Sequence, residues 1–353
     1  MVDCGHSPPR EKCPVCQSKR SNPPLGKRHV VPDGDDKWLG SFNAMEAAAV
    51  TVVIPHLSTP ELLEAAVPLW LLQEGKPYIL IVDTGSSEAD CQRIEKLRSD
   101  RVEIHYLKAH GHVHSSAPVG LAMDFATARV ASPFMFSTHT DVFPKRKDFL
   151  KWMSSQCTAE VPVVGWQMSE RTGEQWKECV SHTATMWHMP TMRKIRLSWN
   201  FLWWYEHTGE PRYKTNGYPD TEQPPNLSLK LAGITPKLLG PEPNWEIHQT
   251  EWFTHARSNT CSKVHLPDGN DLRERVKAYT ATTLTEARQR LLDWQRESQR
   301  VSLCLHLGKP AKREAVALNG LSAGKDWRVC DLGKGIVCPC GVCKTCPSYE
   351  ADV

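Results

Sequence analysis

The sequence predicts an α/β fold, with a mostly parallel sheet flanked by helices and small cysteine-rich segments at both ends. Short apolar runs that end in polar residues alternate with amphipathic stretches of helical spacing from about residue 48 onward. Strands that alternate with helices of about ten to fifteen residues indicate right-handed crossovers, and therefore parallel neighbours. The chain holds 13 cysteines, most of them near its two ends.

The expected elements follow one another in a regular order. A strand over 51–54 leads into a helix over 60–74, because Ser58, Thr59 and Pro60 provide a cap and a first-turn proline. Further strands are expected at 78–83, 102–107 and 134–141, with helices at 87–98 and 117–131. After residue 141 we expect strands at 161–166, 182–187 and 238–240, an aromatic helix at 190–207, a helix ending at Gly233 and a charged helix at 271–298.

Composition sets the domain organisation and excludes some classes of protein. We expect an N-terminal segment at 1–47, a main domain at 48–270, a helix at 271–307 and a tail at 308–353. The net charge of +3 gives no case for general nucleic-acid binding. No stretch approaches the roughly 20 apolar residues of a membrane span, and the N-terminus lacks the apolar core of a signal peptide. A cytoplasmic protein without a membrane span is therefore expected.

Two of the predicted strands end in an aspartate. Asp83 closes the strand over 78–83, and Asp141 follows the apolar run from Phe134. The carboxyl ends of parallel strands line the ligand crevice of an open sheet. This layout suits a nucleotide-sugar donor bound together with a divalent cation.

These motifs resemble those of the GT-A fold glycosyltransferases, closest to the family 2 group, over about residues 48–256. The matching motifs are Val-Ile-Pro55, then Val-Asp83-Thr-Gly85-Ser, and then His139-Thr-Asp141 in place of the Asp-x-Asp metal motif. The resemblance implies that Asp83 contacts the nucleotide base, usually uridine, and that Pro55 and Gly85 belong to the same donor site. It also implies that Asp141 holds Mn²⁺ or Mg²⁺, while His139 departs from the acidic residue of the family.

The resemblance further implies a catalytic base and a late metal-binding histidine. Counting back eleven residues from Gly233 puts Glu222 at the aspartate of the family's Glu-Asp pair, with Asp220 as the fallback. A carboxylate there would take the proton from the acceptor hydroxyl, and the sugar would be transferred with inversion. The late histidine is matched by His255, with His248 as the second choice.

Structural roles remain open for each of these residues. An aspartate that closes a strand often caps a helix or forms a turn, which applies to Asp83 and Asp141. Acidic residues such as Glu222 also favour the first turn of a helix because of its dipole. The alternating His110, His112 and His114 have a metal-like spacing, but we expect them to lie in a mobile loop before the helix at 117–131.

The cysteine clusters suggest metal binding of a different kind. Four zinc-type ligands lie close together at the start of the chain: Cys4, His6, Cys13 and Cys16. Their spacing is typical of a tetrahedral structural zinc site. A denser group lies near the C-terminus: Cys338, Cys340, Cys343 and Cys346. This group could hold a second zinc ion, an iron–sulfur cluster or nothing.

Three classes of function compete at this stage. The first is a metal-dependent glycosyltransferase that moves a sugar from a nucleotide-diphosphate donor to a hydroxyl of a glycan, lipid, protein or nucleic acid. The second is a nucleotidyltransferase of related fold, which would be expected to carry a glycine-rich basic loop after the first strand. The turn after Pro55 has neither glycine nor lysine, which counts against it. The third is a catalytically degenerate, zinc-containing binding protein.

Overall fold

The computed structural model describes residues 43–107, 116–168, 178–209, 221–241, 250–256, 271–307, 328–330 and 335–337. The chain divides into two compact units, Met1–Leu284 and Thr285–Val353. The sheet and the candidate site belong to the first unit, and helix α11 (Asp271–Leu307) crosses the boundary between the two.

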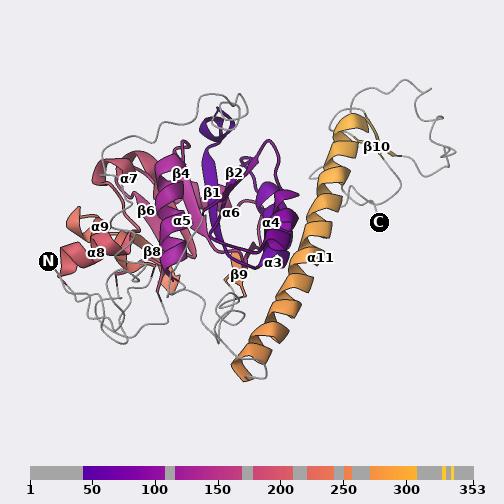
Figure 1. The fold of residues 1–353 in the computed structure, drawn as a ribbon. Helices are drawn as coiled ribbons and strands as arrows, with labels where there is room; N and C mark the ends of the chain where they lie inside the picture. The colour runs from indigo at the N-terminus through magenta and orange to yellow at the C-terminus, as the bar shows by residue number, and fades with distance from the viewer. Residues whose placement is uncertain are drawn as a thin grey trace, which may run out of the picture. The chain divides into compact units, whose positions relative to one another are not determined.

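A seven-stranded, mostly parallel sheet forms the centre of the first unit (Figure 1). Its strands in spatial order are β3 (Val102–Tyr106), β2 (Tyr78–Asp83), β1 (Val50–His56), β4 (Phe134–Thr138), β7 (Ala184–His188), β6 (Val163–Gln167) and β8 (Lys237–Pro241). Strand β7 runs antiparallel to both of its neighbours, and every other pair is parallel. The predicted α/β class with a mostly parallel sheet is therefore confirmed.

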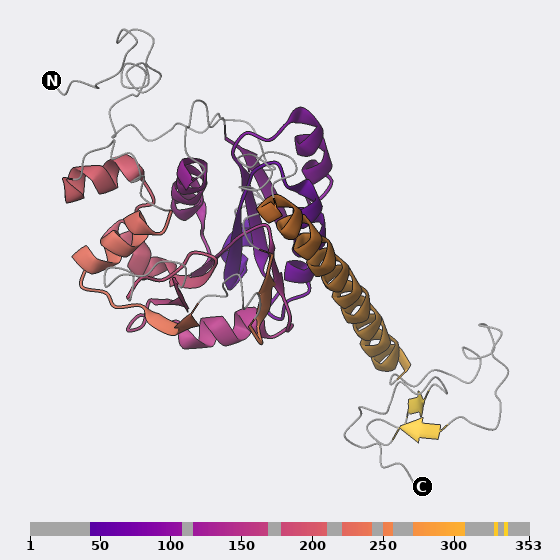
Figure 2. The same cartoon turned by 90° about the horizontal axis from the view of Figure 1, so that it is seen from below.

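Helices cover both faces of this sheet. Helices α3 (Pro60–Leu71) and α4 (Glu88–Glu95) lie on one face and α5 (Ser116–Arg129) on the other (Figures 1 and 2). Every residue of β1 and β2 is buried, as expected for strands covered on both sides. Alternate residues face alternate layers, so Val53 and Leu80 join the core cluster that contains Ala122 and Ala126 of α5.

In the described residues between β4 and α11, the chain forms four helices: α6 (Phe149–Gln156), α7 (Met189–Ile195), α8 (Phe201–Thr208) and α9 (Gln223–Leu231). The expected single helix over 190–207 is wrong, because α7 and α8 are separate. Arg196 ends α7 in a left-handed conformation with φ 55°. The backbone N–H of Trp199 then donates to the side chain of Asp124 at 2.6 Å, which holds the chain in the break.

A second sheet, of two strands, is formed by segments that follow β4 in the sequence. Strand β5 (Val142–Pro144) pairs antiparallel with β9 (Phe253–His255), and Val142 is opposite His255. The sequence analysis did not predict β5, because three residues give too little periodicity for assignment. This pairing brings β9, which lies near the end of the main domain's sequence, directly beside Asp141.

Helix α11 spans Asp271–Leu307. It continues through Leu307, beyond the charged amphipathic stretch that ends near residue 298, and the first helix-breaking residue after it is Gly308. In the first unit its buried residues include Val276, Thr280 and Thr283, which share one face of the helix. In the second unit, β10 (Arg328–Cys330) and β11 (Gly335–Val337) form an antiparallel pair. No helix among the described residues is long and apolar enough to cross a membrane.

Candidate functional site

The site lies at the carboxyl ends of β2, β1 and β4, where the strand order reverses on either side of β1. Ligands of open α/β sheets bind in the crevice at such a switch point. Asp83 closes β2, and Asp141 follows β4. The two side chains are almost completely buried, with residue exposures of 1% and 5%.

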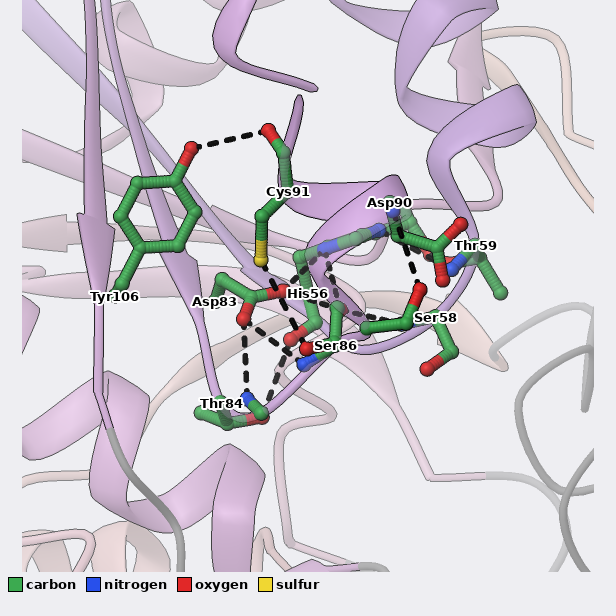
Figure 3. Close-up of polar contacts among 12 residues, drawn as sticks. His56, Ser58, Thr59, Asp83, Thr84, Ser86, Asp90, Cys91 and Tyr106 are labelled. Carbon is green, nitrogen blue, oxygen red and sulfur yellow. Dashed lines mark hydrogen bonds and ion pairs between the residues drawn. The ribbon is translucent and has the colours of Figure 1, made fainter. Parts of the chain in front are cut away.

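Asp83 accepts four hydrogen bonds from its surroundings (Figure 3). Its Oδ1 accepts the backbone N–H groups of Gly85 at 3.0 Å and Ser86 at 3.1 Å. Its Oδ2 accepts the Ser86 hydroxyl and Nδ1 of His56, the latter at 2.7 Å. Two acceptor bonds at each oxygen fill the capacity of a carboxylate, so Asp83 fixes the turn that follows β2.

These hydrogen bonds determine the charge state of Asp83. Burial alone would raise the pKa of this carboxyl, but the bonds from His56, Ser86 and Gly85 stabilise the carboxylate. Their combined effect lowers the pKa of Asp83 below its ordinary value of 3.8. Asp83 is therefore ionised at neutral pH.

His56 is held in one tautomer by a backbone contact. The N–H of Thr59 donates to Nε2 of His56 at 3.1 Å, so Nε2 carries a lone pair. The ring proton is then on Nδ1, which donates to Asp83. The hydroxyl of Thr59 in turn donates to that of Thr140 at 3.3 Å, so hydrogen bonds connect the end of β2 to the residue before Asp141.

A candidate cation site is formed by His139, Asp141 and His255, each of which offers one ligand atom within 4.8 Å of the others. Nε2 of His255 lies 3.4 Å from Oδ1 of Asp141. The backbone explains the proximity, because the N–H of Ala256 donates to the carbonyl of Asp141 at 2.8 Å alongside the β5–β9 pairing. The structure thus brings together the three residues that the resemblance implied for one cation site.

The donor set of this site restricts the cation that fits it. Two imidazoles and one carboxylate suit Mn²⁺ and later transition metals, because Mg²⁺ prefers oxygen ligands throughout. His139, which departs from the acidic residue of the family, supplies one of the two nitrogen donors. The residues present therefore fit a cation of the Mn²⁺ type better than Mg²⁺.

Glu222 lies next to this triad at the start of α9. Glu222 is 6% exposed, and its Oε1 contacts Nδ1 of His182 at 2.6 Å. Nε2 of His182 in turn contacts Nε2 of His139. Thr221, the position of the family's glutamate, is also buried. The predicted base is thus connected to a predicted metal ligand through one imidazole.

His56 and His182 are the two site residues that the sequence analysis missed. His182 lies at the start of a predicted strand, but only the antiparallel pairing of β7 with β4 brings it beside the end of β4. Strand direction cannot be read from a short apolar run. His56 follows Pro55 directly, and a histidine at the end of the first strand was the available signal.

Of the other predicted site residues, Pro55 and Gly85 lie in the described part of the chain. Pro55 lies within β1 opposite Val82, and Gly85 has φ 120°, a conformation that favours glycine. Several predicted residues lie outside the described ranges: Asp220, His248, His110, His112, His114, Cys4, His6, Cys13, Cys16, Cys338, Cys340, Cys343 and Cys346. For these the sequence-based expectations stay predictions.

Comparisons with known proteins found similar structures but no similar sequence. No protein-family model matches the sequence, and no curated protein does either. The matching solved structures include glycosyltransferases. A 4-diphosphocytidyl-2C-methyl-D-erythritol synthase from Anaerococcus prevotii also matches.

Three of these structures illustrate the range of similarity. S. aureus TarS in complex with UDP-GlcNAc is 15% identical with a TM-score of 0.34, over 43% of this chain and 48% of that one. The mannosyltransferase PcManGT from Pyrobaculum calidifontis, in complex with GDP-Man and Mn²⁺, is 14% identical with a TM-score of 0.37, over 77% and 78%. GlyE from Streptococcus pneumoniae is 12% identical with a TM-score of 0.44, over 70% and 63%. The chain thus spans about half the length of that TarS structure. With TM-scores below 0.5, none of these similarities indicates an activity.

Proposed function

We propose that this protein is a metal-dependent glycosyltransferase that moves a sugar from a nucleotide-diphosphate donor, a UDP-sugar in the first instance, to a hydroxyl acceptor with inversion. The observation that carries the proposal is the convergence of His139, Asp141 and His255 at the switch point of the sheet. In the family that the motifs resemble, a cation would lie against the donor diphosphate. The sequence motifs predicted the donor at the same strand ends.

The cation site gives each residue of the triad a role. A bound cation would stabilise the negative charge that develops on the leaving diphosphate. Asp141 would supply the one anionic ligand, while His139 and His255 would supply neutral nitrogen ligands. Because Asp141 and His255 are both about 95% buried, water competes little for these positions.

The nucleotide side of the proposed site is the turn after β2. Asp83 would act on the base in the manner of the family by exchanging the Ser86 hydroxyl for a group of the base. Its bonds from the N–H groups of Gly85 and Ser86 would still hold the backbone of the turn in one conformation. Gly85 would let the backbone approach the nucleotide closely because it has no side chain. Pro55 would complete this side from the end of β1.

The acceptor side of the proposed site contains the carboxylate of Glu222. A base placed there would remove the proton of the acceptor hydroxyl, an effect that contributes about 10²–10⁴-fold to the rate of comparable reactions. Asp220 is the second candidate for this role. The aromatic residues at 199–205 would shape the acceptor side.

The turn after β1 argues against nucleotidyl transfer. A phosphate-cradling loop needs backbone N–H groups that point at the ligand. Here the N–H of Ser58 donates to the Ser86 hydroxyl at 2.7 Å, and the N–H of Thr59 donates to His56. Both groups are therefore engaged within the protein, as the lack of glycine and lysine in this turn had suggested.

Release of nucleoside diphosphate tests the proposal. The purified full-length chain would be incubated with UDP-glucose, UDP-GlcNAc or GDP-mannose, in Mn²⁺, in Mg²⁺ or in EDTA, with and without glycan, lipid, protein and nucleic-acid acceptors. We expect release in Mn²⁺, less in Mg²⁺ and none in EDTA. Asp141→Asn should lower the rate at least about 100-fold. Asp148→Asn is the matched control, because Asp148 is exposed and pairs with Arg146.

The same assay distinguishes the other two classes. Pyrophosphate release from a nucleoside triphosphate and a sugar phosphate would contradict glycosyl transfer and favour a nucleotidyltransferase. Tight donor and Mn²⁺ binding without turnover on any acceptor would favour a degenerate binding protein.

A further inference from the structure

Three side chains from distant parts of the sequence form a continuous chain of contacts beside the candidate cation site. Oε1 of Glu222 lies 2.6 Å from Nδ1 of His182, and Nε2 of His182 contacts Nε2 of His139. The His139 and His182 ring centroids are 4.2 Å apart with the planes tilted by 58°. Glu222 and His182 are each about 95% buried, so the contacts are shielded from water.

The order of donors and acceptors in this chain follows from its carboxylate end. An ionised Glu222 can only accept, so Nδ1 of His182 carries the proton and donates it. Nε2 of a neutral His182 then has a lone pair and accepts from Nε2–H of His139. Nδ1 of His139 is then the unprotonated ring nitrogen, and a cation requires an unprotonated nitrogen of an imidazole.

The surrounding structure holds this chain in place. The carbonyl of Glu222 accepts the side-chain Nδ2 of Asn226 at 2.8 Å. The same Asn226 side chain bonds both backbone groups of Val180, at 3.0 and 2.9 Å. Asn226 therefore fixes the start of α9 to the segment that leads into β7 and carries His182. The ring of Trp199 packs edge-on to that of His182, with the centroids 6.0 Å apart.

We propose that His182 is a positioning residue for the cation site. It fixes His139 as the Nε2–H tautomer, so that Nδ1 of His139 faces the cation, and it ties that ligand to the carboxylate of Glu222. The inference rests on the cation role proposed above for His139. Partners that donate to or accept from a metal-binding histidine set its tautomer and ring orientation in many metal sites.

The tautomers can be measured directly in the metal-free wild-type protein. Long-range ¹H–¹⁵N correlation spectra of the full chain labelled with ¹⁵N-histidine would be assigned with the variants His139→Gln and His182→Gln. We expect His139 protonated at Nε2 only and His182 protonated at Nδ1 only. A His139 ring protonated at Nδ1, or a His182 ring protonated at both nitrogens, would overturn the proposal.

Cation affinity gives a second readout. Mn²⁺ binding without any donor would be measured by calorimetry for the wild type, His182→Leu, His182→Gln and His188→Gln. Leucine removes both hydrogen bonds, so we expect about 10–100-fold weaker Mn²⁺ binding. Glutamine can still donate and accept, so its loss should be several-fold smaller. His188 lies at the other end of β7, where it contacts Thr191, and its variant should bind like the wild type.

The outcomes separate this inference from the proposed function. If the wild type and His182→Leu bind Mn²⁺ equally, the positioning role is wrong while the cation site stands. If the wild type does not bind Mn²⁺, the cation site and the positioning role both fall. If His182→Leu fails to fold by circular dichroism, the spectra of the wild type and the affinity of His182→Gln still decide.

Discussion

Asp83 accepts two hydrogen bonds at each carboxylate oxygen and lies at the end of a fully buried strand. The residue therefore combines the structural role of a turn former with a place at the proposed donor site. The same is true of His56, because its two ring nitrogens bind Asp83 on one side and the backbone of Thr59 on the other. The positions of these two residues in the site therefore depend on hydrogen bonds that cannot be read from the sequence.

Replacing Asp83 by asparagine should destabilise the fold in a pH-dependent manner. The amide nitrogen would face a hydrogen-bond donor, which costs about 1–3 kcal/mol at neutral pH. The pKa of Asp83 is lowered by folding, so its stabilising effect is present above 3.8 and is lost as the pH falls through the folded-state value. Urea unfolding of the wild type and Asp83→Asn should therefore differ at pH 7 and converge at acid pH. Asp100→Asn, at an exposed position, should show neither effect.

Asp124 should have the opposite pH dependence. Burial raises the pKa of Asp124 to about 6, although the bond from the Trp199 N–H partly offsets it. Between about pH 4 and 6 the folded state keeps the Asp124 proton, whereas the unfolded state, with a pKa of 3.8, has lost it. The free energy of unfolding should therefore fall as the pH rises through this range. Asp124→Asn keeps an acceptor for Trp199 and should be more stable at pH 8 by about 1–3 kcal/mol. Equal stability of the two proteins at pH 8 and at pH 4 would contradict the shift.

At the scale of elements, the close contact of β6 with β7 depends on a glycine. A Cβ on Gly165 would lie 2.1 Å from Oγ1 of Thr185 and 2.6 Å from Cγ2 of Val180. Because β7 is central in the sheet, its neighbours cannot move away easily. We expect Gly165→Ala to lower the free energy of unfolding by about 1–3 kcal/mol. Gly209→Ala, where no atom lies within 4 Å but φ is 67°, should cost less in the same thermal and urea measurements.

The elements also show how far a sequence can predict this structure. The strands over 78–83 and 102–107 were predicted nearly to the residue, because each is an apolar run bounded by polar residues. The break between α7 and α8 could not be predicted, because it depends on the left-handed Arg196 and on Asp124 from a distant helix. In the site, the three residues that the structure brings together, His139, Asp141 and His255, had been named from the sequence, but His182 required knowledge of the β4–β7 pairing.

At the scale of the whole molecule, the two cysteine-rich ends predict a zinc content that does not depend on the candidate active site. We expect about one zinc ion for the ligand set that contains Cys4, and a second if the C-terminal cluster binds one. Elemental analysis of the full chain would measure both. Cys13→Ser with Cys16→Ser should remove one zinc ion. Cys91→Ser should remove none, because Cys91 is a free thiol in the described part of the chain.

The short β5–β9 sheet has a consequence for how the protein folds. One of its strands comes from the middle of the main domain's sequence and the other from near its end, and Asp141 and His255 meet only after the two strands pair. Contacts between residues so distant in the chain form late, because the loop they close costs entropy before it is stabilised. A cation that binds the triad would therefore bind late in folding, and a newly made chain would lack the complete cation site until β9 had paired with β5.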